Sequence, residues 1–187
     1  ITVKSQEAQF DAYKQVFSTT EVFEKMLNRF STLIFGSDSM QEVFEGVVNL
    51  SLELLDLEDL SIFLVDHKNQ LLKQTLLVDS NKDIQFASEG FITIALDKGL
   101  TGRCVTALET ITIHDVSLDQ DYMSNRIECK SKIAVPIVFQ NQVLGVIDSE
   151  STKIGKFNYK IKRVLEGIAS LLAIKLNELE KIDALES

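Results

Sequence analysis

The sequence predicts an α+β domain in which helices flank a six-stranded antiparallel sheet. Apolar residues recur at helical spacing near both ends of the chain, whereas the middle holds short apolar runs separated by turn residues. A length of 187 residues is sufficient for one domain. The hydrophobic content of 45% excludes a disordered chain.

The composition restricts the partners and the compartment. A net charge of −9 opposes direct binding to nucleic acid or to an anionic membrane. No apolar stretch reaches the ~18 residues that a membrane-spanning helix requires. The two cysteines, Cys104 and Cys129, suggest a reducing compartment, so we expect a cytoplasmic protein. Because the chain begins at Ile1, we expect it to be a segment of a longer protein.

Two helices are predicted at the start of the chain. Val3, Phe10 and Phe17 follow one another every seven residues, which is coiled-coil spacing. We expect residues 18–20 to interrupt this helix, with the threonine at position 20 capping a second one that ends near Gly36.

A third helix and a hairpin follow. Ser39 and Glu42 have the spacing of a capping box, which predicts a helix that begins there. The apolar runs 60–65 and 71–78 flank a turn-rich tetrapeptide and predict a β-hairpin. The polar residues 79–90 predict a loop.

The middle of the chain is a series of short elements. We expect a strand at 91–95, a short helix at 99–108 and another strand at 110–113. Residues 114–130 are polar and predict an irregular segment.

A second hairpin and a final helix complete the fold. Residues 133–139 and 142–148 are apolar runs joined by two turn residues, which predicts antiparallel strands. Pro136 has no N–H to donate, so we expect it at a bulge or an unpaired position. Asn158 is a suitable N-cap for the last helix.

The segment from residue 99 to residue 151 carries four motifs in a characteristic order. They are Gly99-Leu100-Thr101-Gly102-Arg103, Ile113-His114-Asp115-Val116, Ser131-Lys132-Ile133-Ala134-Val135-Pro136-Ile137 and Val143-Leu144-Gly145-Val146-Ile147-Asp148-Ser149-Glu150-Ser151. Together they resemble the GAF family, whose fold is related to that of PAS domains. The resemblance divides the chain into an N-terminal linker helix (1–20), a GAF domain (21–176) and a C-terminal linker helix (177–187).

The resemblance also implies a ligand site on one face of the sheet. Arg103, at the start of a short helix, could hold an anionic ligand, although a surface ion pair with a nearby acid is the alternative. His114 could contact a ligand or could be an ordinary hydrogen-bonded residue. The residues that the resemblance places around the site are Phe91, Thr93, Gly102, Arg103, His114, Asp119, Tyr122 and Ser131.

No motif identifies a cofactor. The sequence has no histidine pair at metal-binding spacing and no C-x-x-C, so no metal site is expected. The signature of cyclic-nucleotide-binding GAF domains is absent, and neither cysteine has the neighbouring histidine common in bilin-binding relatives. The cofactor, if there is one, is left unknown.

The resemblance implies a sensory domain, without catalytic activity, that controls a linked output in a bacterial signalling protein such as a histidine kinase of a two-component system. One alternative is a free methionine sulfoxide reductase, a group with the same fold that requires an activated thiol. The cysteines of that group align near Thr101 and Asn125, and Lys132 replaces an acid that the group carries.

The other alternative is a structural dimerisation module. The last helix continues its apolar stripe beyond residue 176, where no strand remains to be covered. We therefore expect a parallel homodimer formed by the helices at both ends of the chain. The apolar positions of the stripe are Leu165, Ile168, Leu172, Leu179 and Ile182.

Overall fold

The computed structural model describes residues 3–78, 81–119, 122 and 128–186. Within residues 3–19 and 183–186 it describes the course of the helix but not the side chains. The predictions that concern the side chains of Val3, Phe10 and Phe17 therefore lie outside the described residues.

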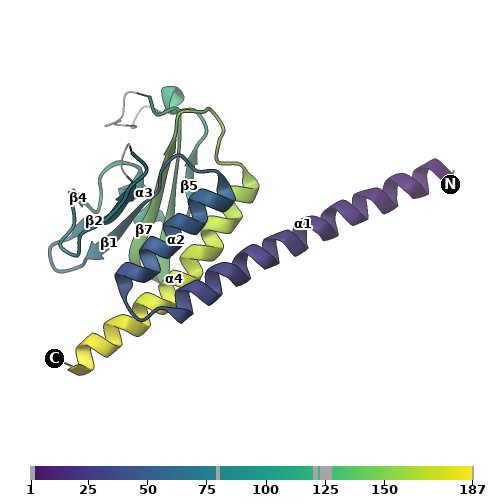
Figure 1. Ribbon diagram of the computed structural model, residues 1–187. Coiled ribbons are helices and arrows are strands. Elements are labelled where there is room, and N and C mark those ends of the chain that lie inside the picture. The colour runs from purple at the N-terminus through teal and green to yellow at the C-terminus, as the bar shows by residue number, and fades with distance from the viewer. Residues whose placement is uncertain (1–2, 79–80, 120–121, 123–127, 187) are drawn as a thin grey trace.

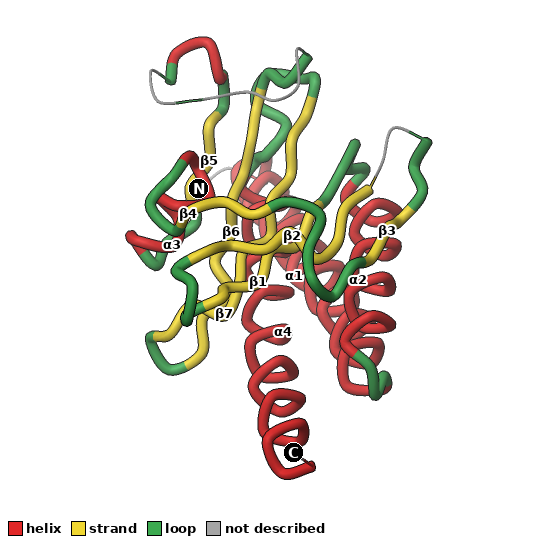
Figure 2. The backbone as a smooth tube through the Cα atoms, turned by 90° about the vertical axis from the view of Figure 1, so that its left-hand side faces the viewer, coloured by secondary structure: helices red, strands yellow, loops and turns green. Residues whose placement is uncertain are grey.

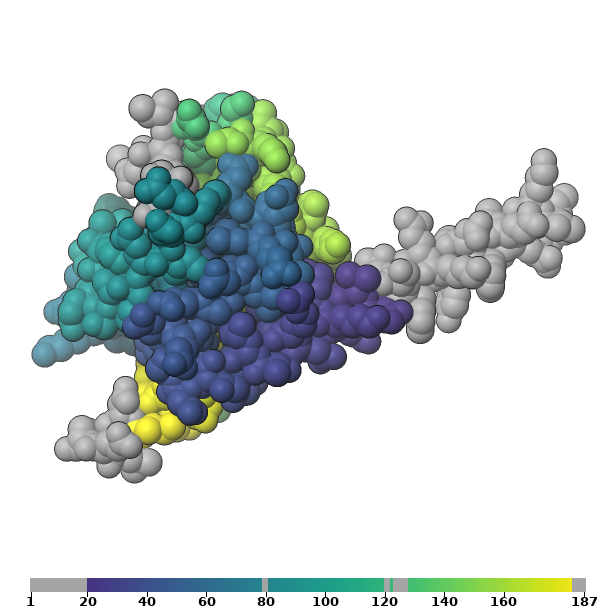
Figure 3. Space-filling model, viewed as in Figure 1, coloured from purple at the N-terminus to yellow at the C-terminus, as the bar shows by residue number. Residues whose placement is uncertain are grey.

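Three helices form one layer of the molecule. They are α1 (Val3–Gly36), α2 (Met40–Leu55) and α4 (Tyr159–Glu186). Figure 1 shows α2 and α4 crossing one face of the sheet, while the N-terminal half of α1 extends away from the body. The space-filling view shows α1 and α2 packed closely against each other (Figure 3).

The predicted break at residues 18–20 is wrong, because α1 is a single helix that runs through this segment. The three residues are serine and threonine, whose hydroxyls are tolerated inside a helix. Proline and glycine are the residues that most often interrupt a helix. α1 contains no proline and, before Gly36, no glycine. The helix ends at Gly36, as predicted.

The predicted caps of the other two helices are confirmed. Ser39 Oγ accepts a hydrogen bond from the backbone N–H of Glu42 at 3.2 Å, at the start of α2. Asn158 Oδ1 accepts one from the N–H of Ile161 at 3.0 Å, at the start of α4. In each case a side chain satisfies a backbone donor that the first turn of a helix leaves unpaired.

Within the described residues the sheet has seven strands, and every pairing between them is antiparallel. The spatial order is β3-β2-β1-β7-β6-β5, and β4 pairs with a second part of the β2 edge. The strands are β1 (Ser61–Asp66), β2 (Leu71–Val78), β3 (Ile84–Phe86), β4 (Thr93–Ala95), β5 (Ile111–Ile113), β6 (Ser131–Phe139) and β7 (Gln142–Ser151).

The predicted sheet is confirmed with one addition, because β3 lies inside the segment predicted as a loop. Its residues pair with the end of β2, where Ile84 lies opposite Val78 and Phe86 opposite Leu76. Only two apolar residues alternate with one glutamine in this strand, which is too short a pattern to distinguish from a loop.

The hairpin of β6 and β7 has the predicted two-residue turn. Gln140 and Asn141 both have positive φ angles, of 47° and 67°, as a type I′ turn requires. Pro136 pairs with Val146 of β7, whereas the pairing with β5 ends at Ala134. β5 does not extend to Pro136, and among the described residues no other strand pairs with this edge of β6. The missing N–H of Pro136 therefore interrupts no ladder on the β5 side, as predicted.

Apolar clusters lie on both faces of the sheet. The larger one fills the space between the sheet and the layer of α1, α2 and α4. The smaller one lies on the other face, beneath α3 (Gly99–Ala107), which contacts β5, β6 and β7. Figure 2 shows α3 on the side of the sheet away from the long helices. We call the side that α3 covers the α3 face.

Candidate functional site

Helix α3 lies close to its preceding loop because Gly102 has no side chain. A Cβ at this position would lie 2.7 Å from the carbonyl carbon of Asp97 and 2.8 Å from the carbonyl oxygen of Leu96. Any larger residue would therefore push α3 away from the loop.

A buried ion triad lies on the α3 face of the β6–β7 hairpin. Nζ of Lys132 lies 3.1 Å from Oδ2 of Asp148 and 2.8 Å from Oε1 of Glu150. The three side chains are 14%, 10% and 14% exposed. One cation is thus enclosed by two carboxylates where little water screens the charges.

The triad shifts the protonation of its members. Burial alone would lower the pKa of the Lys132 ammonium, but the carboxylates of Asp148 and Glu150 raise it above its ordinary value. Burial raises the pKa of Asp148, and Lys132 opposes this effect. Lys132 is therefore charged at every physiological pH.

The other oxygen of Asp148, Oδ1, lies outside the ion pair with Lys132. It is buried and has no hydrogen-bond partner among the residues that the structure describes. Two residues lie opposite Asp148 on the neighbouring strands: Ala134 on β6 and Ser61 on β1. Gln74 Nε2 donates a hydrogen bond to Ser61 Oγ at 3.0 Å. The α3 face thus places a buried acceptor between the apolar cluster that includes Ala134 and the polar pair of Ser61 and Gln74.

Two cysteines lie beside the triad and remain free thiols. Cys104 of α3 is buried, and burial together with the charge of Asp148 raises its pKa to about 12. Cys129 is partly buried, and burial raises the pKa of this thiol above its ordinary value as well. The Cys129 thiol donates a hydrogen bond to the carbonyl of Ser131 at 3.4 Å. Both groups are therefore protonated at neutral pH.

The connection between α2 and β1 holds the end of β7. Asp59 Oδ1 accepts a hydrogen bond from the N–H of Glu150 at 2.6 Å. Glu58 accepts one from the Ser151 hydroxyl at 2.6 Å and one from the N–H of Thr152 at 2.8 Å. These two carboxylates join the end of α2 to the strand that carries Glu150.

An ion pair links α3 to the segment after β5. Nη2 of Arg103 lies 2.9 Å from Oδ2 of Asp119, so the structure brings these two predicted site residues together. A hollow of about 270 Å³ lies beside it, against β5 and the short 3₁₀ helix Val116–Leu118. Its lining residues are Thr112, Ile113, His114, Asp115, Leu118 and Asp119.

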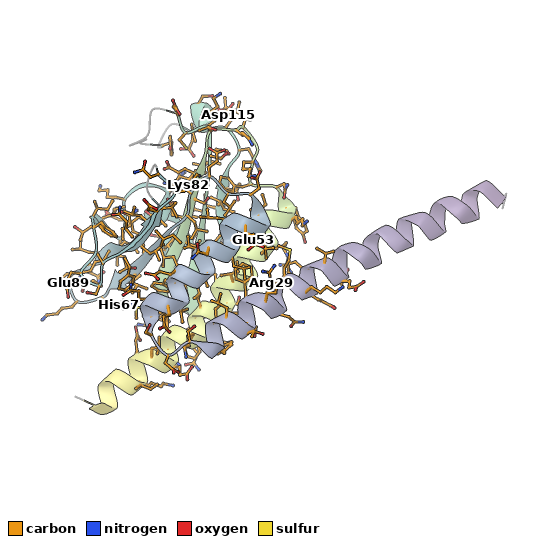
Figure 4. The ribbon with its side chains drawn as sticks, viewed as in Figure 1. Arg29, Glu53, His67, Lys82, Glu89 and Asp115 are labelled. Carbon is orange, nitrogen blue, oxygen red and sulfur yellow. The ribbon has the colours of Figure 1, made fainter. Side chains whose placement is uncertain are left out.

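His114 and Asp115 turn the chain at the end of β5. The His114 carbonyl accepts a hydrogen bond from the N–H of Gly155 at 2.8 Å, and its side chain is exposed. Asp115 caps the 3₁₀ helix by accepting from the N–H and the hydroxyl of Ser117. Figure 4 shows Asp115 at the end of the molecule opposite His67.

The remaining predicted site residues are spread over the molecule. Phe91 is 39% exposed and Thr93 is exposed at the start of β4. Tyr122 packs against the smaller apolar cluster on the α3 face. Ser131 is buried, and its hydroxyl donates to the carbonyl of Lys153 at 2.6 Å. In the alternation of β6 it shares the face of Ile133, which belongs to the larger core and not to the α3 face.

The segment predicted to be irregular, residues 114–130, is described only in part. Residues 120–121 and 123–127 lie outside the described residues. The alignment position Asn125 lies there too.

The site predicted from the sequence did not include the triad. Without a bulge, the two-residue turn would pair Lys132 with Ser149. The register instead shifts between Ile137 and Val138, which places Lys132 opposite Glu150 and on the same face as Asp148. Pro136, which we expected at a bulge or an unpaired position, lies one residue before this shift. It does not show which residues would then lie opposite each other, so the sequence alone did not reveal the triad.

The described residues contain no group of three or more histidine, cysteine, aspartate or glutamate side chains that could hold a metal ion. In the same part of the chain, no helix has both the length and the apolar character needed to cross a bilayer.

A family model described as a GAF domain matches residues 37–177, three quarters of the chain. The chain belongs to the GAF domain family. The resemblance and the fold class predicted from the sequence are thereby confirmed.

Solved structures with the same fold include other GAF domains and an enzyme. The GAF domain from an Acinetobacter phosphoenolpyruvate-protein phosphotransferase has a TM-score of 0.75 at 19% identity and covers 87% of this chain and 98% of its own. Free methionine-R-sulfoxide reductase from Neisseria meningitidis, in complex with its substrate, has a TM-score of 0.72 at 16% identity and covers 86% of this GAF domain and 91% of its own chain.

A curated relative is the free methionine-R-sulfoxide reductase of Escherichia coli strain K12. It is 29% identical over 91 residues, which are 49% of this chain. The chain spans about half the length of this relative, 51%. The expectation of a domain without catalytic activity is corrected by this finding, because the sequence relatives of this GAF domain include an enzyme.

Proposed function

We propose that this GAF domain binds a small molecule on the α3 face, beside Asp148, and transmits the bound state to a linked domain through its end helices. The observation that carries the proposal is the buried Oδ1 of Asp148, which has no partner among the described residues. Leaving a buried acceptor unpaired costs about 1–3 kcal/mol, and a ligand that donates a hydrogen bond would recover this cost.

The carboxylates of the α2–β1 connection supply a route from this site to the helices. Glu150 takes part in the triad through its side chain and is held by Asp59 through its backbone. A ligand that moves the triad would therefore also move the connection that follows α2. Differential binding of about 1–3 kcal/mol is sufficient to shift such an equilibrium.

A thermal-shift screen tests the proposal. Wild-type protein and Asp148→Asn are screened against metabolites, nucleotides and small anions, with Glu53→Gln, an exposed position on α2, as the matched control. A ligand at a hundred times its Kd stabilises the folded state by about 2.7 kcal/mol. We expect a ligand that raises the Tm of wild type and of the Glu53 variant but not of Asp148→Asn. Silence of the wild type across the screen would reject the proposal.

Reduction of free methionine-R-sulfoxide is a second candidate, favoured by the Escherichia coli relative and by two free thiols beside the triad. In such a reaction two thiols are oxidised to a disulfide, and the sulfoxide oxygen leaves as water. The raised pKa values of Cys104 and Cys129 leave little thiolate at neutral pH, so we expect slow turnover at most.

Turnover of free methionine-R-sulfoxide with thioredoxin as reductant tests this candidate. Activity that is lost in Cys129→Ser and retained in the Glu53 control would support it. Absence of product in wild type would reject it, whatever the outcome of the ligand screen.

We further propose that two copies form a parallel homodimer through α1 and α4. Val22 and Phe35 of α1 and Ile174 and Ile182 of α4 expose between 43% and 49% of their surface. Apolar positions of this kind on extended helices suit a partner helix. A cytoplasmic bacterial signalling protein, such as a histidine kinase of a two-component system, is the setting that this arrangement would serve.

A further inference from the structure

The triad places the ammonium group of Lys132 between two carboxylates. Lys132 extends from β6 across the side of Ala134 to reach Asp148, the residue opposite Ala134 on β7. Ala134 is fully buried on the α3 face. Nζ then lies between Oδ2 of Asp148 and Oε1 of Glu150, within hydrogen-bond distance of both.

Two carboxylates that converge on one point form a site for an ammonium group. Both side chains are close to nine-tenths buried, so their charges are little screened and each would be costly to leave unpaired. The Lys132 ammonium supplies the pairing from within the chain. An external cation could enter only by displacing it.

We infer that Lys132 determines the charge class of the ligand: by occupying the Asp148–Glu150 carboxylate pair it excludes cationic groups such as primary amines, and it leaves Oδ1 of Asp148 to an uncharged N–H or O–H donor. This inference rests on the first proposed function, because it assigns a ligand class to the same site. It opposes the second candidate, since free methionine-R-sulfoxide carries a primary amine. Asp148 thus has two oxygens with separate tasks, Oδ2 for the internal lysine and Oδ1 for the ligand.

The first experiment removes the ammonium group that pairs with the two carboxylates. Lys132→Met keeps most of the length of the side chain and removes its charge. Ethylammonium chloride is titrated into wild type, Lys132→Met and the matched control Lys132→Arg, with sodium chloride at equal concentration as the reference and propanol as an uncharged probe of similar size. We expect Lys132→Met to bind ethylammonium at least about tenfold more tightly than the other two proteins, with no such gain for propanol.

A folded Lys132→Met protein that gains no affinity for ethylammonium would overturn the inference, as would a wild type that binds it equally tightly. A second measurement, on wild type, tests the inference if Lys132→Met does not fold. In wild type, acetylation by an amine-reactive ester is followed by mass spectrometry at Lys132 and at the exposed Lys68. We expect Lys132 to react at least about tenfold more slowly, since its ammonium is buried and paired. Equal reactivity would reject the inference.

The ligand site beside Asp148 and the role of Lys132 can be disproved separately. A cationic ligand found in the screen of wild type, whose effect disappears in Asp148→Asn, would uphold the proposed site and overturn the role of Lys132. An uncharged donor with the same dependence on Asp148 supports both.

Discussion

At the scale of single residues, side-chain size decides how closely the strands that carry the site approach one another. Gly145 of β7 lies opposite Leu64 of β1, and the β1 backbone runs very close to it. A Cβ at this position would lie 2.3 Å from the carbonyl oxygen of Phe63. The β1 backbone therefore leaves no space for a side chain at this glycine.

Replacement of Gly145 by alanine is therefore expected to force β1 and β7 apart. Overpacking of this kind costs about 1–3 kcal/mol, and a clash with backbone belongs at the upper end because the carbonyl cannot rotate away. The free energy of unfolding, measured in urea, should fall accordingly. Gly36→Ala is the control, since a Cβ there would meet nothing within 4 Å. Equal stability of the two variants would contradict the packing described here.

At the scale of secondary-structure elements, hydrogen bonds from the α2–β1 connection fasten β7 to the helix layer. Glu58 accepts two of these bonds from Ser151 and Thr152. Burial alone would raise the pKa of Glu58, but the two donors lower it below its ordinary value. A carboxyl whose pKa is lowered in the folded state stabilises the protein above its unfolded-state pKa, and this contribution is lost as the pH falls through the folded-state value.

We expect Glu58→Gln to lower the free energy of unfolding at pH 7 by about 1.5–3 kcal/mol, the range for hydrogen bonds to a charged group. Because the ordinary pKa of glutamate is about 4.3, the difference between wild type and variant should shrink as the pH falls from about 5 to 3. Urea unfolding at several pH values measures it. Glu53→Gln, whose carboxylate is 65% exposed near Arg29 (Figure 4), should change stability by less than about 0.5 kcal/mol. A difference that is independent of pH would contradict the assigned role of Glu58.

Most elements could be predicted from local signals, and the exceptions depend on distant contacts. The two helix caps, Ser39 and Asn158, and the turn at 140–141 depend on residues that are close in the sequence. These features could therefore be predicted from the sequence. Strand β3 exists because the end of β2 offers it a partner. The triad exists because a bulge in the β6–β7 ladder shifts the register by one residue. Pro136 indicates that an irregularity is possible there, but it does not indicate which residues the shift places opposite each other.

At the scale of the whole molecule, the long helices leave the body at both ends. The N-terminal half of α1 extends beyond the sheet, and α4 continues past the last strand (Figure 1). Ile174 and Ile182 are 49% and 43% exposed on α4. A second copy that packs its own helices against these positions would remove this apolar surface from water, which stabilises association by about 25 cal/mol for each Å² buried.

We therefore expect the wild type to sediment as a dimer of the 21.0 kDa chain, and the double variant Ile174→Glu/Ile182→Glu to sediment as a monomer. Introducing charge at a dimer contact adds desolvation and repulsion between the copies, so dissociation should be favoured at least about tenfold. Ile154→Glu is the matched control, because this isoleucine is 63% exposed in the loop that precedes α4 and lies outside the helices. Analytical ultracentrifugation of the three proteins decides the matter: a monomeric wild type, or a double variant that remains dimeric, would contradict the proposed dimer. If the double variant and Ile154→Glu are both monomeric, the dimer contact includes the loop between β7 and α4 instead of the helices alone.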